Sequence, residues 1–419
     1  MSERRTDRDV DQTLDAWMSS VAPTRAPARL LEGTFAETMR SRQKRAYPWH
    51  RIARGRLWPA SRSSGRFVAV LIAGLLLLAV AAGMFGGGSK LTVPPSPSAT
   101  PSASPSAAPA SASPPTPSPI PITPEGAVPV DAPIAMVADG PNLWILAPGR
   151  LDRIDPLANA VTGSIPLGPA SHLYNGVAAN ADGLWATDWD GSVVDRADPA
   201  TLKVVDAIPV ASAPKGVLAT EAGVWVALTH EGTVVRIDPA TNEVVATVNV
   251  GLSGASGPNW LASGLGSIWV DVPNNATVAR ISPVTDVVQA TILMPYPVVA
   301  CGGIGVGTSA VWITSCSAGN LMTRTDPASN RVVATLDLGG QGYLPLMIDD
   351  RPWISVDTGT PDGGFIARID PATNLVDRVL SPGPSFGGGG DMAIAAGSVW
   401  VVDGYHSSVV RLPMAAFGP

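Results

Sequence analysis

The stretch VVRIDPATNEVVATVNVG, residues Val234–Gly251, holds a turn between two runs rich in valine. Short valine-rich runs that flank turn residues are typical of two β-strands joined as a hairpin. Asp238 at the first turn position hydrogen-bonds to the backbone ahead of it, and Pro239 presets the next φ angle. Related stretches, TRTDPASNRVVATLDLG and ARIDPATNLVDRVL, begin at Thr323 and Ala367. The chain therefore repeats one hairpin, which predicts a repeat architecture.

A longer unit surrounds each hairpin from about residue 135 onward. Its tryptophans are Trp144, Trp185, Trp225, Trp269, Trp312, Trp353 and Trp400, with spacings of 41, 40, 44, 43, 41 and 47 residues. Its arginines follow in step, at Arg153, Arg196, Arg236, Arg280, Arg324, Arg368 and Arg411. Seven units with four strand-like runs each predict an all-β, seven-bladed β-propeller over residues 126–419.

The two ends of the array predict how the ring closes. The seventh unit stops at VVRLPMAAFGP, after its third strand-like run, and a spare run at Ala127–Val130 precedes the first unit. Pairing of Ala127–Val130 with Val409–Leu412 would complete the last blade and leave no open edge. The tryptophans are expected to pack between blades, and the arginines to lie over their rings or pair with acids.

A charge-free run, FVAVLIAGLLLLAVAAGMF at residues 67–85, predicts one transmembrane helix. From Arg40 to Arg66 the chain has nine Lys or Arg and no acid. Residues 1–66 carry 14 Lys+Arg and 7 Asp+Glu, whereas the rest of the chain, with an overall net charge of −6, is acidic. The positive-inside rule therefore predicts a single-pass cell-membrane protein with a cytoplasmic N-terminus and an extracytoplasmic propeller. The alternative is a signal peptide that is uncleaved or cleaved late.

Two further segments flank this helix. The basic tail, residues 1–66, has helical patterns at Asp11–Ser20 and Ala28–Arg45, and these are expected to bind a cytoplasmic protein or the membrane surface rather than nucleic acid. Residues 86–125 form a Pro/Ser/Ala/Thr-rich linker that is expected to be disordered and extended. Its hydroxyls are candidate sites for sugars, which composition alone leaves open.

A ligand site is predicted on the face where the loops between strands two and three, and those between blades, open. A concave surface with aromatics and carboxylates suits a glycan, a peptide or another organic ligand, or a protein. The alternative is that these side chains plug blade junctions. Lys215 and Asn259 lie in the same loops. The candidate ligand-binding residues are His172, Tyr174, Asp188, Trp189, His230, Glu231, Trp260, Tyr343, Tyr405 and His406.

The only two cysteines, Cys301 and Cys316, flank the first two strand-like runs of the fifth unit. If Gly307–Ala310 forms a turn, Val306 faces Val311, and counting outward brings the two cysteines opposite each other. The oxidising compartment outside the membrane would preserve a disulfide between them. The alternative is a pair of free buried thiols.

The repeat RIDPATNEVVATVNVG resembles the YVTN type, and the Gly-x-x-Trp strand followed by Arg-Ile-Asp-Pro resembles the propeller of the virginiamycin B lyase family. The resemblance covers about residues 126–413 and implies the propeller fold. In that family, histidines and a glutamate near the central opening support lyase activity with magnesium. The histidines within residues 126–413 are His172, His230 and His406, and none is carried over as catalytic.

Three functions remain open from the sequence. The first is a membrane-anchored propeller that binds a ligand or protein or acts as a scaffold, with no cofactor. The second is a virginiamycin B lyase-like enzyme, which would need magnesium. The third is a transmembrane signal transducer, anti-sigma-like, with a propeller sensor. The sequence has no serine-hydrolase, Walker, HExxH or cysteine-rich zinc motif, so it favours the first.

Overall fold

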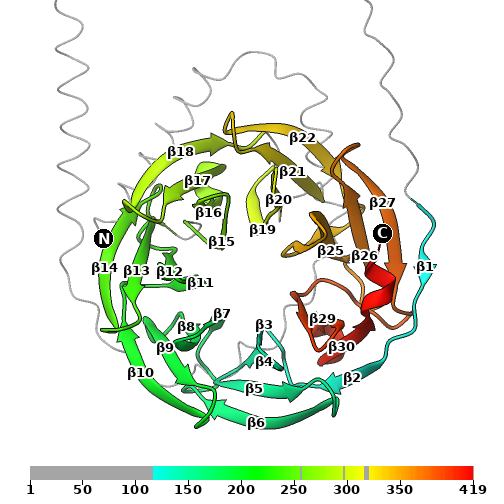
Figure 1. The fold of residues 1–419 in the computed structure, drawn as a ribbon, viewed down its shortest axis with the longest axis horizontal. Coiled ribbons are helices and arrows are strands. Elements are labelled where there is room, and N and C mark those ends of the chain that lie inside the picture. The colour runs from blue at the N-terminus through cyan, green and yellow to red at the C-terminus, as the bar shows by residue number, and fades with distance from the viewer. Residues whose placement is uncertain (1–116, 255–256, 296–297, 316–319, 419) are drawn as a thin grey trace, which may run out of the picture. The chain divides into compact units, whose positions relative to one another are not determined.

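A computed structural model describes residues 117–254, 257–295, 298–315 and 320–418. Within these ranges the chain folds into seven β-sheets arranged as blades around a central axis (Figure 1). This confirms the predicted all-β, seven-bladed propeller. The basic tail, the predicted transmembrane segment 67–85 and most of the predicted linker lie outside the described residues. No helix inside those ranges has the length and apolar character needed to cross a bilayer.

Four blades follow the repeat without interruption. Blade 1 consists of β3 (Ala135–Asp139), β4 (Asn142–Ala147), β5 (Arg150–Asp155) and β6 (Ala160–Pro166). Blade 2 consists of β7 (Tyr174–Asn180), β8 (Gly183–Asp188), β9 (Val193–Asp198) and β10 (Lys203–Pro209). Blade 3 consists of β11 (Pro214–Thr220), β12 (Gly223–Leu228), β13 (Thr233–Asp238) and β14 (Glu243–Asn249). Blade 4 consists of β15 (Leu261–Gly264), β16 (Ser267–Val272), β17 (Thr277–Ser282) and β18 (Val287–Leu293), with a 3-10 turn η2 (Pro273–Asn275).

The other three blades include the exceptions. Blade 5 consists of β19 (Ala300–Val306), β20 (Val311–Ser315), β21 (Leu321–Asp326) and β22 (Arg331–Asp337). Blade 6 consists of β23 (Gln341–Gly342), β24 (Leu346–Ile348), β25 (Arg351–Asp357), β26 (Phe365–Asp370) and β27 (Leu375–Ser381), with β1 (Ile120–Pro121) on its outer edge. Blade 7 consists of β28 (Met392–Ala395), β29 (Ser398–Asp403), β30 (Ser408–Pro413) and β2 (Gly126–Pro129), with the 3-10 turns η3 (Gly404–His406) and η4 (Met414–Phe417).

Blade 6 therefore departs from the four-strand prediction. Its innermost strand is split into β23 and β24, both of which pair with β25. Pro345 lies between the two short strands, and proline has no N–H with which to continue a ladder.

The hydrophobic core lies between adjacent blades. The second strand of most blades is buried on both sides, whereas the outer strands alternate between exposed and partly buried residues. All seven repeat tryptophans are at most 1% exposed, as predicted for residues packed between blades. Trp225 of blade 3, for example, belongs to a cluster with Ile268 and Val270 of blade 4. Each buried tryptophan therefore makes a large apolar contribution to a blade interface.

The repeated Asp-Pro turn of the hairpin has a second role, which is to bind the arginine of the preceding blade. Asn242 ends the turn of blade 3 with a φ of 58°, and Arg196 of blade 2 donates to its Oδ1 at 2.7 Å and to the Pro239 carbonyl at 2.6 Å. The Arg196 guanidinium also lies 5.1 Å from the Trp185 ring centroid. Arg196 thus covers the tryptophan of its own blade and is held by the turn of the next blade.

The same contact recurs around the ring and closes it. Arg280 donates to Pro327 and Asn330, Arg324 to Pro371 and Asn374, and Arg411 of blade 7 to Pro156 and Asn159 of blade 1. We call this contact the arginine latch. Six arginine–tryptophan contacts of 4.9 to 5.7 Å accompany it.

At the other three interfaces the arginine makes a different contact. Blade 4 has Asp286 where four other turns have asparagine, and Arg236 forms a bidentate ion pair with it at 2.9 and 2.7 Å. Arg368 binds the Gly418 carbonyl at 3.0 Å, because blade 7 has no turn of this kind. Blade 2 has Leu202 at the asparagine position, and Arg153 bonds to Thr162 of its own blade instead.

Ring closure occurs where the sequence predicts it. β2 pairs antiparallel with β30, with Ala127 opposite Val410 and Val128 opposite Val409. β1 adds a parallel contact to β27, and Figure 1 shows this segment running along the outside of blade 6 toward β2. Glu125 then pairs with Arg411 at 2.9 Å. The contacts of the propeller begin at Ile120, ahead of the expected boundary at residue 126.

The hairpin of blade 5 bears on the cysteine prediction. Val306 pairs with Val311, as expected, but the register shifts between Ala300 and Gly303, so that Ala300 pairs with Ser315. The straight count that placed Cys301 opposite Cys316 is therefore wrong. Cys316 lies outside the described residues, so the disulfide itself stays a prediction. Alkylation of the native protein without reductant, followed by mass spectrometry of its peptides, tests it.

Candidate functional site

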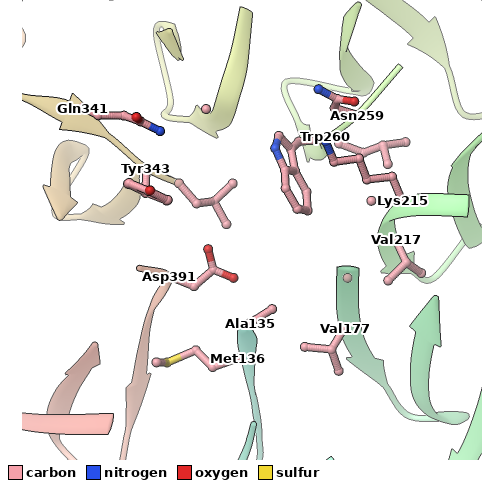
Figure 2. Close-up of a pocket in the computed structure, with 15 residues that line it drawn as sticks. Ala135, Met136, Val177, Lys215, Val217, Asn259, Trp260, Gln341, Tyr343 and Asp391 are labelled. Atoms are coloured by element: carbon pink, nitrogen blue, oxygen red, sulfur yellow. The ribbon is translucent and has the colours of Figure 1, made fainter. Parts of the chain in front are cut away.

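A pocket of about 330 Å³ lies on the axis of the propeller, and all seven described blades contribute to it. Figure 2 shows side chains from opposite blades converging on one hollow. The lining residues are Ala135, Met136, Gly176, Val177, Lys215, Gly216, Val217, Asn259, Trp260, Leu261, Gly302, Gln341, Tyr343, Leu344 and Asp391. We call this cavity the axial pocket.

The axial pocket draws on one position of the repeat. Counting back nine or ten residues from a repeat tryptophan reaches Lys215, Asn259, Trp260, Tyr343 or Asp391. The same count reaches small residues in the other blades, such as Gly176 nine residues before Trp185. This position begins the innermost strand, where the blades come closest together. Large or polar side chains there therefore point to a ligand rather than to framework.

Glycines allow the innermost strands to approach each other. A Cβ on Gly216 would lie 2.2 Å from the Asn259 carbonyl oxygen, and the Gly216 N–H donates to that oxygen at 2.8 Å. Buried hydroxyls brace the same strands from the side: Thr187 donates to the Lys215 carbonyl at 2.6 Å, and Thr314 to the Tyr343 carbonyl at 3.2 Å. These contacts position the backbones that carry the pocket residues.

Lys215 and Trp260 form one wall of the axial pocket. The Lys215 ammonium lies 5.4 Å from the Trp260 ring centroid. Beneath them, Asp271 is wholly buried, and its Oδ1 accepts the Trp260 N–H at 2.6 Å and the Asn259 N–H at 3.3 Å. Burial raises the pKa of Asp271 to about 7 and lowers the pKa of Lys215, while the charge of each opposes these shifts in the other. This wall is therefore a polar cluster held by the backbone.

Asp391 and Tyr343 form the opposite wall. The Asp391 carboxylate points into the hollow (Figure 2), and the Met136 N–H donates to it. Burial raises the pKa of Asp391 to about 6. Burial also raises the pKa of Tyr343, and the nearby Asp357 adds to this. This wall therefore presents one buried acid and one phenol.

Three predicted site residues gather at the loops of blade 2, away from the axial pocket lining. His172 Nδ1 lies 2.8 Å from Asp188 Oδ2, and this hydrogen bond is the main cause of the raised pKa of His172. Tyr174 is 1% exposed, and burial raises its pKa. Nearby, burial and the Asp188 charge raise the pKa of Asp195 to about 7.

Three others lie at the junction of blades 2 and 3. The Trp189 and His230 rings meet edge to face with centroids 5.0 Å apart. Glu231 accepts a hydrogen bond from Ser212 at 3.1 Å. These contacts hold the loops of blades 2 and 3 against each other.

The last two, Tyr405 and His406, lie on blade 7. The Tyr405 hydroxyl donates to Asp357 at 3.2 Å, and a Cβ on Gly389 would lie 3.0 Å from Tyr343 and 2.7 Å from Asp357. Tyr405 is therefore close to the rim of the axial pocket. His406 pairs with Asp403 at 3.0 Å and faces a separate apolar groove of about 370 Å³ between blades 6 and 7.

The structure thus divides the ten predicted residues instead of placing them around one opening. Trp260 and Tyr343 line the axial pocket, and the other eight lie in the three clusters just described, in loops or at strand ends. Asp391 and Gln341 were missed by the sequence reasoning. Both stand nine to twelve residues before a repeat tryptophan, and that position was the available signal.

The magnesium site implied by the resemblance to the lyase family finds no match in these residues. His172 and His406 each pair with an aspartate of their own blade, and His230 contacts Trp189. In the described ranges, no three His, Cys, Asp or Glu side chains come together as metal ligands would. The residues present therefore do not fit that group.

Comparison with known proteins supports the fold. No family model matches the chain, and no curated protein matches it. Among solved structures, a chain of Kuenenia stuttgartiensis hydrazine synthase is 16% identical, with a TM-score of 0.58 over 68% of this chain and 97% of that one. A streptogramin B lyase is 14% identical, with a TM-score of 0.57 over 68% and 94%. The lyase match confirms the fold resemblance that the repeats indicate.

Proposed function

We propose that this protein is a membrane-anchored, extracytoplasmic β-propeller that binds a small organic ligand in the axial pocket. The observation that carries the proposal is the convergence of Lys215, Trp260, Tyr343 and Asp391, from four blades, on one cavity. Ligand sites are commonly concave, largely apolar and supplied with a few converging polar groups. The charge-free segment 67–85 and the basic residues before it support the anchor and its orientation.

Binding fits this site better than lyase chemistry does. The three histidines of the propeller lie in loops, two of them paired with aspartates, and none lines the axial pocket. The pocket's own groups are an amine, a carboxylate, two amides and two aromatic rings. Such a set orients and holds a ligand.

A thermal-shift screen of small organic compounds on the purified full-length protein tests the proposal. A binding compound is expected to raise the melting temperature, and Trp260→Phe and Tyr343→Ala are expected to reduce that rise while leaving the unliganded melting temperature close to wild type. Trp189→Ala, at the junction of blades 2 and 3, serves as the control and should keep the rise. Retention of the full rise in both pocket variants, or no stabilising compound at all, would refute the proposal.

A further inference from the structure

The axial pocket holds one amine and one carboxylate among its lining side chains. Lys215 comes from blade 3 and Asp391 from blade 7, and Figure 2 shows them on opposite sides of the hollow. Within the described residues, neither has an ion-pair partner. Two opposite charges that are partly buried and kept apart are both incompletely compensated.

The Lys215 side favours an anionic group on the ligand. Its ammonium lies over the Trp260 ring at 5.4 Å, and Asp271 behind it is engaged by two backbone N–H groups. The Asp271 carboxyl forms no salt bridge with Lys215. A ligand carboxylate would supply the close charge-assisted hydrogen bond that Lys215 lacks.

The Asp391 side favours a cationic group. One backbone N–H, that of Met136, donates to this carboxylate, and burial opposes its ionisation. A ligand ammonium would offset the cost of that burial. The Tyr343 ring lies on the same wall (Figure 2), and aromatic faces also attract ammonium groups.

The space between the two charges is mostly apolar. Met136, Val177 and Val217 supply aliphatic surface, and Trp260 and Tyr343 supply aromatic surface. Asn259 and Gln341 add amide groups that suit a peptide bond. The cavity volume of about 330 Å³ is at the small end of the usual range for ligand sites.

From this arrangement, and resting on the proposed function, we infer that the ligand is a zwitterion of the size of an amino acid or a short peptide. Its carboxylate binds Lys215, its ammonium binds Asp391, and its side chain packs on Trp260 and Tyr343.

The test uses calorimetric titration of the full-length protein, purified in detergent, with alanyl-phenylalanine and free phenylalanine as probes. The dipeptide is compared with its N-acetylated, C-amidated and doubly blocked forms. Blocking either end is expected to weaken binding about 10- to 100-fold, as loss of a charge-assisted contact does. Tighter binding of the dipeptide than of phenylalanine identifies a peptide site, and the reverse identifies an amino-acid site.

Two variants assign the ends. In Lys215→Met, amidation should no longer weaken binding while acetylation still does; in Asp391→Asn the pattern should reverse. Lys203→Met and Glu243→Gln, on exposed outer strands, are the matched controls and should behave as wild type.

The inference of a zwitterionic ligand is wrong if all four dipeptide forms bind with equal affinity. It is also wrong if neither alanyl-phenylalanine nor phenylalanine binds. If the compound screen still yields a ligand that depends on Trp260 and Tyr343, the proposed function stands without it. If the screen yields none either, both proposals are wrong.

Discussion

At the scale of single residues, the asparagine that ends the hairpin turn in blades 1, 3, 5 and 6 links one blade to the next. Asn242 adopts a left-handed conformation that asparagine tolerates well, and its side chain accepts the Arg196 guanidinium. Leu202 occupies the same position in blade 2 with a φ of 57°. This left-handed conformation is energetically unfavourable for leucine. The interface between blades 1 and 2 therefore lacks this arginine latch.

Two single substitutions at these positions, Asn242→Leu and Leu202→Asn, should change the free energy of unfolding in opposite directions. Asn242→Leu removes the oxygen that accepts from Arg196 and the amide that donates to Asp206, and should destabilise the propeller by about 2 kcal/mol. Leu202→Asn relieves backbone strain and offers Arg153 an acceptor, and should stabilise it by about 1 kcal/mol, after some loss of apolar packing.

Thermal and urea unfolding of the two variants measure this difference. Thr201→Asn, one residue before Leu202, is a control for added polarity in the same turn. A destabilised Leu202→Asn would mean that the packing of Leu202 outweighs the latch.

A second residue-scale prediction concerns Asp195, which is 4% exposed beside Asp188. Its pKa is about 7 in the folded protein against 3.8 for the free side chain, so the folded state holds a proton that the unfolded state loses between these values. Its contribution to stability is therefore present at low pH and is lost as the pH rises through 7.

Asp195→Asn should accordingly stabilise the protein at pH 8, by about 2 to 4 kcal/mol, and change little at pH 4.5. Denaturation curves from pH 4.5 to 8.5 compare it with wild type. Glu243→Gln on an exposed outer strand is the control. An equal effect of Asp195→Asn at both ends of the pH range would argue against a buried acid that takes up a proton on folding.

At the scale of elements, the strand that closes the ring comes from the other end of the chain. β2 supplies the outer strand of blade 7, and β1 with Glu125 fastens the preceding residues to blades 6 and 7. Val128 is the inward-facing anchor of β2, 2% exposed, and belongs to a core cluster shared with blade 1.

Val128→Asp should therefore open the ring, since it buries an unpaired charge in the closing strand. The expected result is loss of several kcal/mol of stability and aggregation through the exposed edge of β30. Size-exclusion chromatography and thermal melting report both effects. Ala127→Asp, exposed on the other face of β2, should remain monodisperse; a monodisperse Val128→Asp with an unchanged melting temperature would show that closure does not depend on this strand.

At the scale of the whole molecule, the predicted topology separates a basic tail from an acidic propeller. Under the positive-inside rule, the nine basic residues between Arg40 and Arg66 predict a cytoplasmic tail. Protease added to intact cells should therefore remove the propeller and leave the tail protected, as followed by antibodies to each end. Replacing the nine basic residues with glutamine should weaken this orientation, and a protected propeller in the wild type would reverse the assignment.

The blade number and the ring closure were readable from the sequence because both are local or periodic. A tryptophan every 40 to 47 residues marks one interface per unit. The last unit lacks its fourth strand and a spare strand precedes the first unit, so the sequence predicts that the two pair and close the ring. The site was only partly readable. Trp260 and Tyr343 were found as unusual aromatics, whereas Asp391 sits in a glycine run and looks like a turn residue.

The sequence by itself determined that seven hairpin-bearing units form a propeller whose ends meet, since each unit buries its tryptophan only against the next. Only the tertiary structure decided which side chains share the axis. Residues 176 positions apart, Lys215 and Asp391, face one cavity because the curvature of all seven blades adds up to a closed ring. That sum depends on every interface at once, so no single repeat contains it.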